Sequence, residues 1–378
     1  MLGGGGGMKL QEFKLERYFA EHEFSVRHVL SASDCETVSL AELLEMAPPE
    51  AASLWQGLRL GYTESQGHPR LREAIAALYE TVAPEGVVVA APEEAIFIAM
   101  HALLEPGDHV VVMTPSYQSL HEVPRSIGCG VTPWPLEAGR REWRLDLGGL
   151  ERALTGRTRM VVINSPHNPT GAQVTRADLD AIVALARSRG AWLFSDEMYR
   201  LLEHDPADRV PAAADLYERG VSLSGLSKAF GLPGLRIGWL AARNPELPMR
   251  LLELKDYTTI CSSAPSEVLA IAALEARDRI LARNVAIVRG NTAEAARFFA
   301  AHSSRFDWLA PRAGSVAFPR WRGEGTAEEL CAGLLGRHGV MLVPGSLFDA
   351  AEHVRIGLGR RDLPEALTLL GEYLSSMG

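Results

Sequence analysis

Cysteine is scarce in this chain, whose 378 residues include four. They lie far apart and form no C-x-x-C pair, and the histidines show no H-E-x-x-H spacing. Zinc sites and disulfide scaffolds both require such clustering. We therefore expect neither a metal site nor a disulfide framework from Cys35, Cys129, Cys261 and Cys331.

Long apolar runs are missing as well. No stretch approaches the roughly 18 unbroken apolar residues of a membrane span, and no charged segment followed by an apolar one opens the chain. We therefore expect a cytoplasmic protein with no membrane partner. The opening run MLGGGGG predicts a flexible glycine tail over residues 1–7, outside the fold.

Positive charge is in deficit, since 38 Lys and Arg residues oppose 47 Asp and Glu residues and give a formal net charge of −9. Such a chain is poorly suited to neutralise phosphate backbones, which argues against nucleic acid as a partner. No G-x-G-x-x-G motif stands at a strand-to-helix turn, which argues against a nicotinamide dehydrogenase. With 47% apolar and 22% charged residues, the composition is that of a globular protein long enough for two domains.

The chain alternates between two patterns from about residue 67 onward. Apolar residues at helical spacing predict helices near 69–79, 93–104, 116–127 and 175–189. Short apolar runs, typical of strands buried on both faces, occupy 109–115, 159–166, 191–197, 221–225 and 236–242. This alternation predicts an α/β fold with a mainly parallel central sheet, whose ligand site lies at the carboxyl ends of the strands.

The pattern changes after about residue 245, where a long helical stretch precedes shorter strand candidates at 315–321, 339–345 and 353–359. We interpret residues 246–378, completed by residues 8–50, as a smaller α+β domain. Residues 51–245 would then form the large domain that carries the sheet.

Polar side chains follow the predicted strands at the points where a site is expected. They are Asn168 in SPHNPTG, Asp196 and Tyr199 in SDEMY, and Lys228 and Arg236 in LSKAFGLPGLR. Taken singly, Asp196 could cap a helix and Asn168 could serve a turn. A lysine among Ser, Ala and Gly, however, is a candidate amine nucleophile for a carbonyl, and the arginine is an anion fork.

These motifs, in this order, resemble those of the fold type I pyridoxal-phosphate enzymes, specifically the class I/II aminotransferases, from about Tyr18 to Leu374. The resemblance implies that Lys228 forms the internal aldimine with pyridoxal 5'-phosphate and moves the substrate proton, and that Asp196 pairs with the pyridinium nitrogen. It also implies that Asn168 and Tyr199 hydrogen-bond the ring phenolate oxygen and so set the pKa of the aldimine.

The same resemblance assigns roles to five further residues. Tyr117 in TPSYQSL would stack on the cofactor ring, and Ser227 with Arg236 would bind its phosphate. Tyr62 in LGYTESQG would reach the phosphate of a neighbouring subunit, which implies a homodimer. Arg355 in VRIGLG would clamp the substrate carboxylate, next to Asn168.

Two departures from the family pattern concern the phosphate. The helix start that usually carries small residues reads AAPEE at 90–94, where Pro92 lacks an amide donor and Glu93 would repel an anion that it faced. We expect the Glu93 side chain to point away and its backbone N–H to bind the phosphate. A hydroxyl residue is also common where this chain has Gly225.

The motifs leave the reaction open, because the cofactor supplies the electron sink for several. We take an aminotransferase for an L-amino acid, with a 2-oxo acid as acceptor, as the first hypothesis. The alternative is an eliminase/cyclase that acts on a hydroxylated arginine, because TPSYQSL, LKDYTTICSS and PRAGSVAFPRW resemble segments of capreomycidine synthase. A guanidinium substrate would need acids such as Asp34, Glu36 or Asp256, whereas an apolar or aromatic one would contact Phe24 or Tyr18.

Overall fold

A computed structural model describes residues 10–377, so the predicted tail at residues 1–7 lies outside the described residues. Within that range the largest sheet has eight strands in the order β1-β8-β7-β6-β5-β2-β3-β4. The neighbours from β7 to β3 run parallel, and β8, β1 and β4 are antiparallel additions. The bounds are β1 Val87–Ala90, β2 His109–Thr114, β3 Gly130–Ala138, β4 Trp143–Leu145, β5 Thr158–Asn164, β6 Trp192–Asp196, β7 Gly220–Gly225 and β8 Gly238–Ala242.

The prediction of an α/β fold with a mainly parallel sheet is confirmed. All five strands predicted for this region are present, although β8 is antiparallel to its neighbour β7. The sequence analysis missed β1, β3 and β4. The strand β3 contains Pro133 and Pro135, which argue against a strand in the sequence because proline lacks the amide proton that pairs neighbouring strands.

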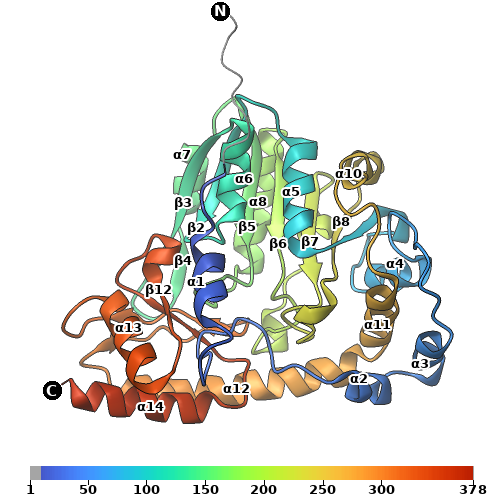
Figure 1. Ribbon diagram of the computed structural model, residues 1–378. Helices are drawn as coiled ribbons and strands as arrows, with labels where there is room; N and C mark the ends of the chain where they lie inside the picture. Colours follow the sequence, from blue (N-terminus) through green and yellow to red (C-terminus); the bar gives the residue numbers. More distant parts are fainter. Residues whose placement is uncertain (1–9, 378) are drawn as a thin grey trace, which may run out of the picture.

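Helices cover both faces of this sheet (Figure 1). Val110 and Val112 of β2 share a core with α5 and α6, whereas Val111 between them packs with α7 and α8. Successive residues of a strand point to opposite faces, so both faces are buried. The helices here are α4 Pro69–Ala76, α5 Pro92–Leu103, α6 Ser119–Ile127, α7 Leu147–Ala153, α8 Arg176–Ser188, α9 Ala213–Leu216 and α10 Leu247–Lys255.

The C-terminal part builds two small sheets, β10-β13-β12 and β11-β9. All three strand candidates of this part contain strands, but the strands are shorter than expected. Their bounds are β9 Phe306–Asp307, β10 Val316–Ala317, β11 Arg320–Trp321, β12 Val343–Pro344 and β13 Val354–Gly357. The helices are α11 Ala264–Glu275, α12 Arg277–Ala301, α13 Ala327–His338 and α14 Leu363–Ser376.

The N-terminal helices associate with different parts of the molecule. Leu15 of α1 (Lys14–His22) packs with Phe318 and Met341 in a small core of the C-terminal part. In contrast, α2 (Leu40–Met46) and α3 (Pro49–Gln56) pack against α11. The predicted domain boundary near residue 245 stays a prediction. Short 3-10 helices lie at η1 Pro84–Gly86, η2 Pro206–Asp208, η3 Pro233–Leu235 and η4 Gly345–Phe348.

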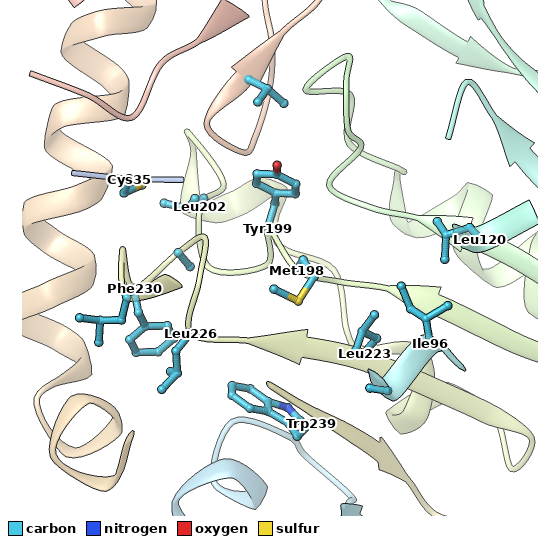
Figure 2. Close-up of a cluster of buried hydrophobic side chains, with 14 of the residues drawn as sticks. Cys35, Ile96, Leu120, Met198, Tyr199, Leu202, Leu223, Leu226, Phe230 and Trp239 are labelled. Atoms are coloured by element: carbon cyan, nitrogen blue, oxygen red, sulfur yellow. The ribbon is translucent and has the colours of Figure 1, made fainter. Parts of the chain in front are cut away.

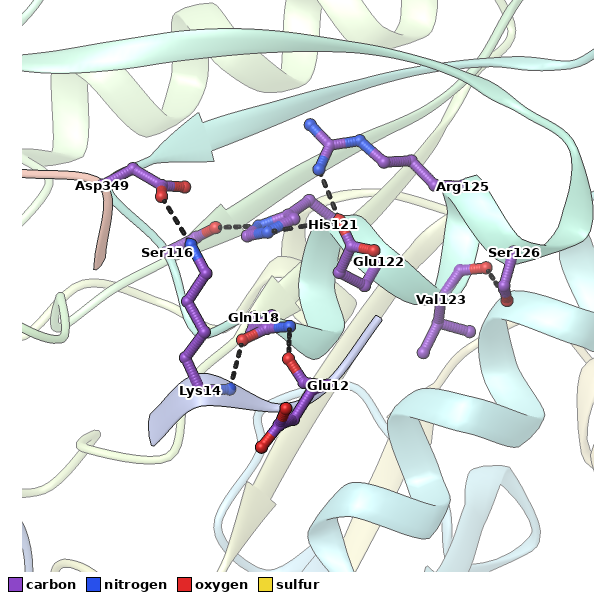
Figure 3. Close-up of polar contacts among 10 residues, drawn as sticks. All are labelled: Glu12, Lys14, Ser116, Gln118, His121, Glu122, Val123, Arg125, Ser126 and Asp349. Atoms are coloured by element: carbon purple, nitrogen blue, oxygen red, sulfur yellow. Dashed lines mark hydrogen bonds and ion pairs between the residues drawn. The ribbon is translucent and has the colours of Figure 1, made fainter. Parts of the chain in front are cut away.

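Helix α1 lies between the large sheet and the C-terminal elements (Figure 1). Its first residue, Lys14, is tied to both parts (Figure 3): the backbone N–H donates to Gln118 Oε1 at 3.0 Å, and Nζ pairs with Asp349 Oδ1 at 3.1 Å. Gln118 Nε2 also donates to the Glu12 carbonyl at 2.8 Å. These contacts position α1 at the edge of the sheet where the predicted site lies.

Within residues 10–377, no helix combines the length and the apolar character that crossing a membrane requires.

Candidate active site

A cavity of about 590 Å³ lies at the carboxyl ends of the parallel strands, between them and α1. It brings together residues from the ends of β6 and β7, from β13 and from the start of α5. Nine of the predicted site residues line it: Glu93, Tyr117, Asn168, Asp196, Tyr199, Ser227, Lys228, Arg236 and Arg355. Tyr62 is the exception, since it is 93% exposed and lies outside this cavity.

Lys228 is positioned by the turn that follows β7. Leu226 and Phe230 on either side of it are buried (Figure 2), and Asn284 Nδ2 donates to the Ala229 carbonyl at 2.8 Å. The lysine Nζ donates to Ser33 Oγ at 2.8 Å. Burial lowers the pKa of Lys228, and the nearby Asp34 carboxylate only partly opposes that shift. A larger share of the amine is therefore neutral, which is the form that attacks a carbonyl.

Asp196 ends β6, the strand between β5 and β7. Burial raises the pKa of its carboxyl to about 6, against the opposing effects of the Met198 backbone N–H at 3.1 Å and of Lys228. A cation placed beside this carboxyl would restore its ionised form. Asp196 is therefore a suitable partner for a protonated ring nitrogen.

Arg355 is 1% exposed and has no carboxylate partner within residues 10–377. One terminal nitrogen donates to Asn168 Oδ1 at 3.2 Å and the other to the Ser31 carbonyl at 3.1 Å, while Nε has no hydrogen-bond acceptor in the described chain. Burial lowers the pKa of this guanidinium. A buried cation with an unused donor at the cavity wall can bind an anion, and the two parallel donors of a guanidinium suit a carboxylate.

The Tyr199 hydroxyl is buried and has no hydrogen-bond partner of normal geometry among the described residues, although Ser33 lies close enough to affect its pKa. Burial raises the pKa of this phenol, so it stays protonated and can donate. Gly314, which has φ +76, packs closely against this ring, and a Cβ at that position would lie 3.3 Å from Tyr199 Cδ1. An unpartnered buried hydroxyl in a cavity wall is costly unless a ligand supplies the acceptor.

The phosphate end differs from the expectation. Ser227 and Arg236 both line the cavity, as the resemblance implies. We expected the Glu93 side chain to point away, but it is part of the cavity wall and accepts a hydrogen bond from Ser119 Oγ at 3.3 Å. Burial raises the pKa of the Glu93 carboxyl to about 7. The Glu93 carboxyl is therefore largely buried beside α6, and the binding of the phosphate by its backbone N–H stays a prediction.

Two carboxylates that the sequence analysis did not name, Glu16 and Glu23, also line the cavity. With Phe19, they occupy positions i, i+3 and i+7, so they share one face of α1 and its C-cap residue Glu23, a signal that the sequence contains. Of the acids that we did name, Asp34 lines the cavity and is held by Arg360 at 2.8 and 3.0 Å.

Of the other residues that we expected to contact the substrate, one lines the cavity and three do not. Glu36 and Asp256 do not line the cavity, and Glu36 accepts instead from the backbone N–H of Arg361 at 3.0 Å. Tyr18 donates to the Leu342 carbonyl at 2.9 Å, away from the cavity, whereas Phe24 lines it.

Comparison with known proteins identifies the family. Residues 29–367 match the family described as aminotransferase class I and II. This chain belongs to that family. Capreomycidine synthase of Streptomyces vinaceus is 34% identical over 378 residues, which cover 99% of this chain and 96% of that protein.

Two solved structures support the assignment of the fold. A PLP-dependent aminotransferase from Streptococcus suis 89-1591 has a TM-score of 0.90 and 32% identity, and covers 98% of both chains. The PLP-dependent cyclase OrfR in complex with Au has the same TM-score, identity and coverage. The fold is therefore that of the fold type I pyridoxal-phosphate enzymes.

Pyridoxal 5'-phosphate is the cofactor of this family, and the cavity fits it. Lys228 would offer the amine for the aldehyde, Asp196 the acid for the ring nitrogen, Tyr199 a donor for the ring oxygen, and Ser227 with Arg236 donors for the phosphate. When bound, the cofactor supplies an electron-poor ring that stabilises negative charge at the substrate α-carbon.

Proposed function

We propose that this chain is a pyridoxal-phosphate enzyme for an L-amino acid with a guanidinium-bearing side chain, and that it cyclises a hydroxylated form of that substrate. In the cyclisation the substrate loses its hydroxyl group as water, and a side-chain nitrogen closes the ring. Atoms balance without an oxidant or an amino acceptor.

The charge of the cavity wall carries the proposal for the substrate class. Glu16 and Glu23 line the cavity, and within the described chain neither forms an ion pair. The cations of the wall have other partners. Arg360 is paired with Asp34, whereas Lys228 suits the cofactor aldehyde, Arg236 its phosphate and Arg355 the substrate carboxylate. Two carboxylates thus remain without a cation, and a guanidinium would compensate both.

The side chains divide the work as follows. Arg355 binds the α-carboxylate, and its bond to Asn168 Oδ1 at 3.2 Å sets the plane of the fork. The amine of Lys228 receives the α-proton and returns it, since burial keeps its pKa low. Tyr117 is held by its 2.7 Å hydrogen bond to Glu16, which links the aromatic wall to α1. Leu15, Glu16 and Phe19 of α1 form one side of the cavity and so limit the access of water to it.

The full-length likeness to capreomycidine synthase supports cyclisation as the reaction. An aminotransferase with a 2-oxo acid acceptor is the second candidate. The PLP-dependent aminotransferase from Streptococcus suis 89-1591 is as similar in structure to this chain as the PLP-dependent cyclase OrfR is. Both candidates use the same lysine and the same carboxylate clamp. The product distinguishes them.

The test supplies the holoenzyme with arginine, hydroxylated arginine, citrulline and leucine, each with and without 2-oxoglutarate. We expect a cyclic product from hydroxylated arginine without 2-oxoglutarate, and no turnover of citrulline, which has the shape of arginine without its charge. New glutamate that depends on 2-oxoglutarate would support the second candidate. Turnover of leucine and citrulline in preference to both arginines would overturn the substrate class.

A matched pair of variants tests the role of α1. Glu23→Gln should raise KM for the cationic substrate by about tenfold, since a charge-assisted contact contributes about 1.5 kcal/mol. Glu21→Gln removes the same charge from the same helix, but this residue lies outside the cavity wall, so we expect little change. Equal effects of the two variants would indicate general electrostatics rather than recognition by Glu23.

We further propose that the chain acts as a homodimer in the cytoplasm. Four large apolar side chains, Leu60, Tyr62, Tyr257 and Ile260, are at least half exposed. Their two loops are linked, because buried Lys255 donates to the carbonyl of Ser65. Such a patch on a water-soluble enzyme favours a subunit contact, through which Tyr62 would reach the cofactor phosphate of the partner.

A further inference from the structure

Glu93 lies at the start of α5, where the resemblance to the family implies that the cofactor phosphate binds. It is the second residue of α5, directly after Pro92, and its side chain forms part of the wall that also contains Ser227 and Arg236. Pro92 cannot donate an amide proton to a phosphate. A carboxylate in this position would lie in the same cavity as a phosphate dianion, and like charges at short range repel strongly when they are shielded from water.

The surroundings of Glu93 offer little to keep it ionised. Ser119 and Tyr117 face it from α6 and from the loop before α6, Glu16 from α1, and Asp196 from the end of β6. Arg236 is the cation that faces it from the β8 side. The acids facing Glu93 thus outnumber the cations, before any phosphate is counted.

The other helices and strands packed against α5 contribute no compensating cation. β7 and β8 contain no titratable residue in GVSLSG and GWLAA. On α10, Arg250 donates to the carbonyl of Ala102, and Lys255 to that of Ser65. On α6, Arg125 is paired with Glu122 (Figure 3), and His121 shares a 2.9 Å hydrogen bond with Ser116.

We propose that Glu93 is a neutral, protonated acid in the loaded enzyme, so that binding of the phosphorylated cofactor is coupled to uptake of one proton by this side chain. The proton comes from solvent and adds to the carboxylate, and no other bond changes. The protonated acid has an O–H donor in a cavity wall where proline has removed an amide donor. The inference rests on the cofactor of the family and not on the proposed substrate or reaction.

The sign of the pH dependence follows from linkage. In the free protein burial already raises the pKa of Glu93 to about 7, and a bound phosphate raises it further. Below about pH 7 the acid is neutral before the cofactor arrives, so the affinity is independent of this group. Above about pH 7 a proton has to be taken up, and the affinity falls by up to about tenfold for each pH unit.

The test measures the dissociation constant of pyridoxamine phosphate between about pH 6 and pH 9. This ligand carries the phosphate but forms no bond to Lys228, so titration of the lysine–aldehyde bond does not contribute. We expect Glu93→Gln to bind it equally or more tightly than wild type at about pH 9. The ratio of the wild-type to the Glu93→Gln dissociation constant should rise with pH from about pH 7.

Three controls make the result specific. Glu94→Gln removes the same charge one residue further along α5, but Glu94 accepts from Thr259 Oγ1 at 2.7 Å, outside the cavity wall, so its pH profile should match wild type. Pyridoxamine, which lacks the phosphate, should give a smaller change in the ratio. Calorimetry in buffers of different ionisation enthalpy should show proton uptake by wild type that Glu93→Gln lacks.

A ratio that stays constant from about pH 6 to pH 9, or equal proton uptake by wild type and Glu93→Gln, would overturn the proposal. If Glu93→Gln does not fold, Glu93→Ala supplies the same comparison without a polar group. Failure of the cyclase proposal would leave these binding curves unchanged, so the two failures are distinguishable.

Discussion

Arg355 lies fully buried in the strand β13 and forms no ion pair with a carboxylate of residues 10–377. Structural arginines at this depth are normally paired, because a buried unpaired charge is strongly destabilising. Two neutral oxygens, Asn168 Oδ1 and the Ser31 carbonyl, orient the fork, and Nε is left without an acceptor in the described chain. At the scale of a single residue, this arrangement distinguishes a binding group from a stabilising one.

The corresponding prediction is that Arg355→Lys lowers kcat/KM for the amino acid by about 10- to 100-fold, mostly through KM, because lysine cannot keep both positioning bonds and also bind a carboxylate with two donors. Steady-state kinetics of the holoenzyme measure the effect. The control is Arg320→Lys, which changes an exposed arginine paired with Glu352 and should have little effect. An unchanged KM for Arg355→Lys would contradict the carboxylate clamp.

At the same scale, the motifs predicted much of the site but not all of it. Asp196 and Lys228 were predicted because they stand at or just beyond the ends of short apolar runs, in motifs that resemble those of the family, and both line the cavity. Glu16 and Glu23 were missed because an amphipathic helix normally presents its acids to solvent. Which acids of α1 face a cavity depends on what packs over the helix.

At the scale of elements, the strand β13 and residues 30–34 approach each other unusually closely. The backbone N–H of Gly357 donates to the Leu30 carbonyl at 2.7 Å, and a Cβ on Gly357 would lie 1.9 Å from the Ala32 carbonyl oxygen. Arg355 is on one of these segments, and Ser33 and Asp34 are on the other. The glycine therefore keeps Arg355 near Ser33 and Asp34, which contact or affect Lys228.

We predict that Gly357→Ala destabilises the protein by about 2 kcal/mol or more, because backbone has to move to relieve the overlap. It should also weaken substrate binding by displacing Arg355. Urea unfolding and substrate titration measure the two effects. Gly336→Ala is the matched control, since this exposed residue of α13 has no atom within 4 Å of an added Cβ. It should stabilise the protein by about 0.5–1 kcal/mol.

At the scale of the whole molecule, the cavity holds nine of the ten predicted site residues, and Tyr62 lies outside it at 93% exposure. Buried groups fix the loop that carries Tyr62, since Glu267 accepts from Thr63 Oγ1 at 2.6 Å and from the His68 N–H at 3.0 Å. An aromatic side chain on a firmly held loop, but exposed in the single chain, is suited to a partner subunit.

A hybrid dimer tests this contribution across subunits. When Lys228→Ala and Tyr62→Ala chains are co-expressed, the hybrid dimer should contain one intact site, composed of Lys228 from one chain and Tyr62 from the other. We expect its activity to approach half that of the wild-type dimer, whereas both parent homodimers are impaired. If Tyr62 acted within its own chain, the hybrid would contain no intact site and would be no more active than the parents.

The sequence determined the family, the α/β class and five strands of the large sheet, because buried strands have local apolar patterns, and it indicated candidate cofactor residues at the ends of those strands. Local patterns do not determine which distant segments meet. Only the tertiary structure joined Ser31 to Arg355 across 324 positions, brought the acids of α1 to the cavity and placed the Glu93 carboxyl in its wall. The physical reason is that these contacts result from packing between elements, and a residue's spacing along its own helix or strand does not encode its partner on another.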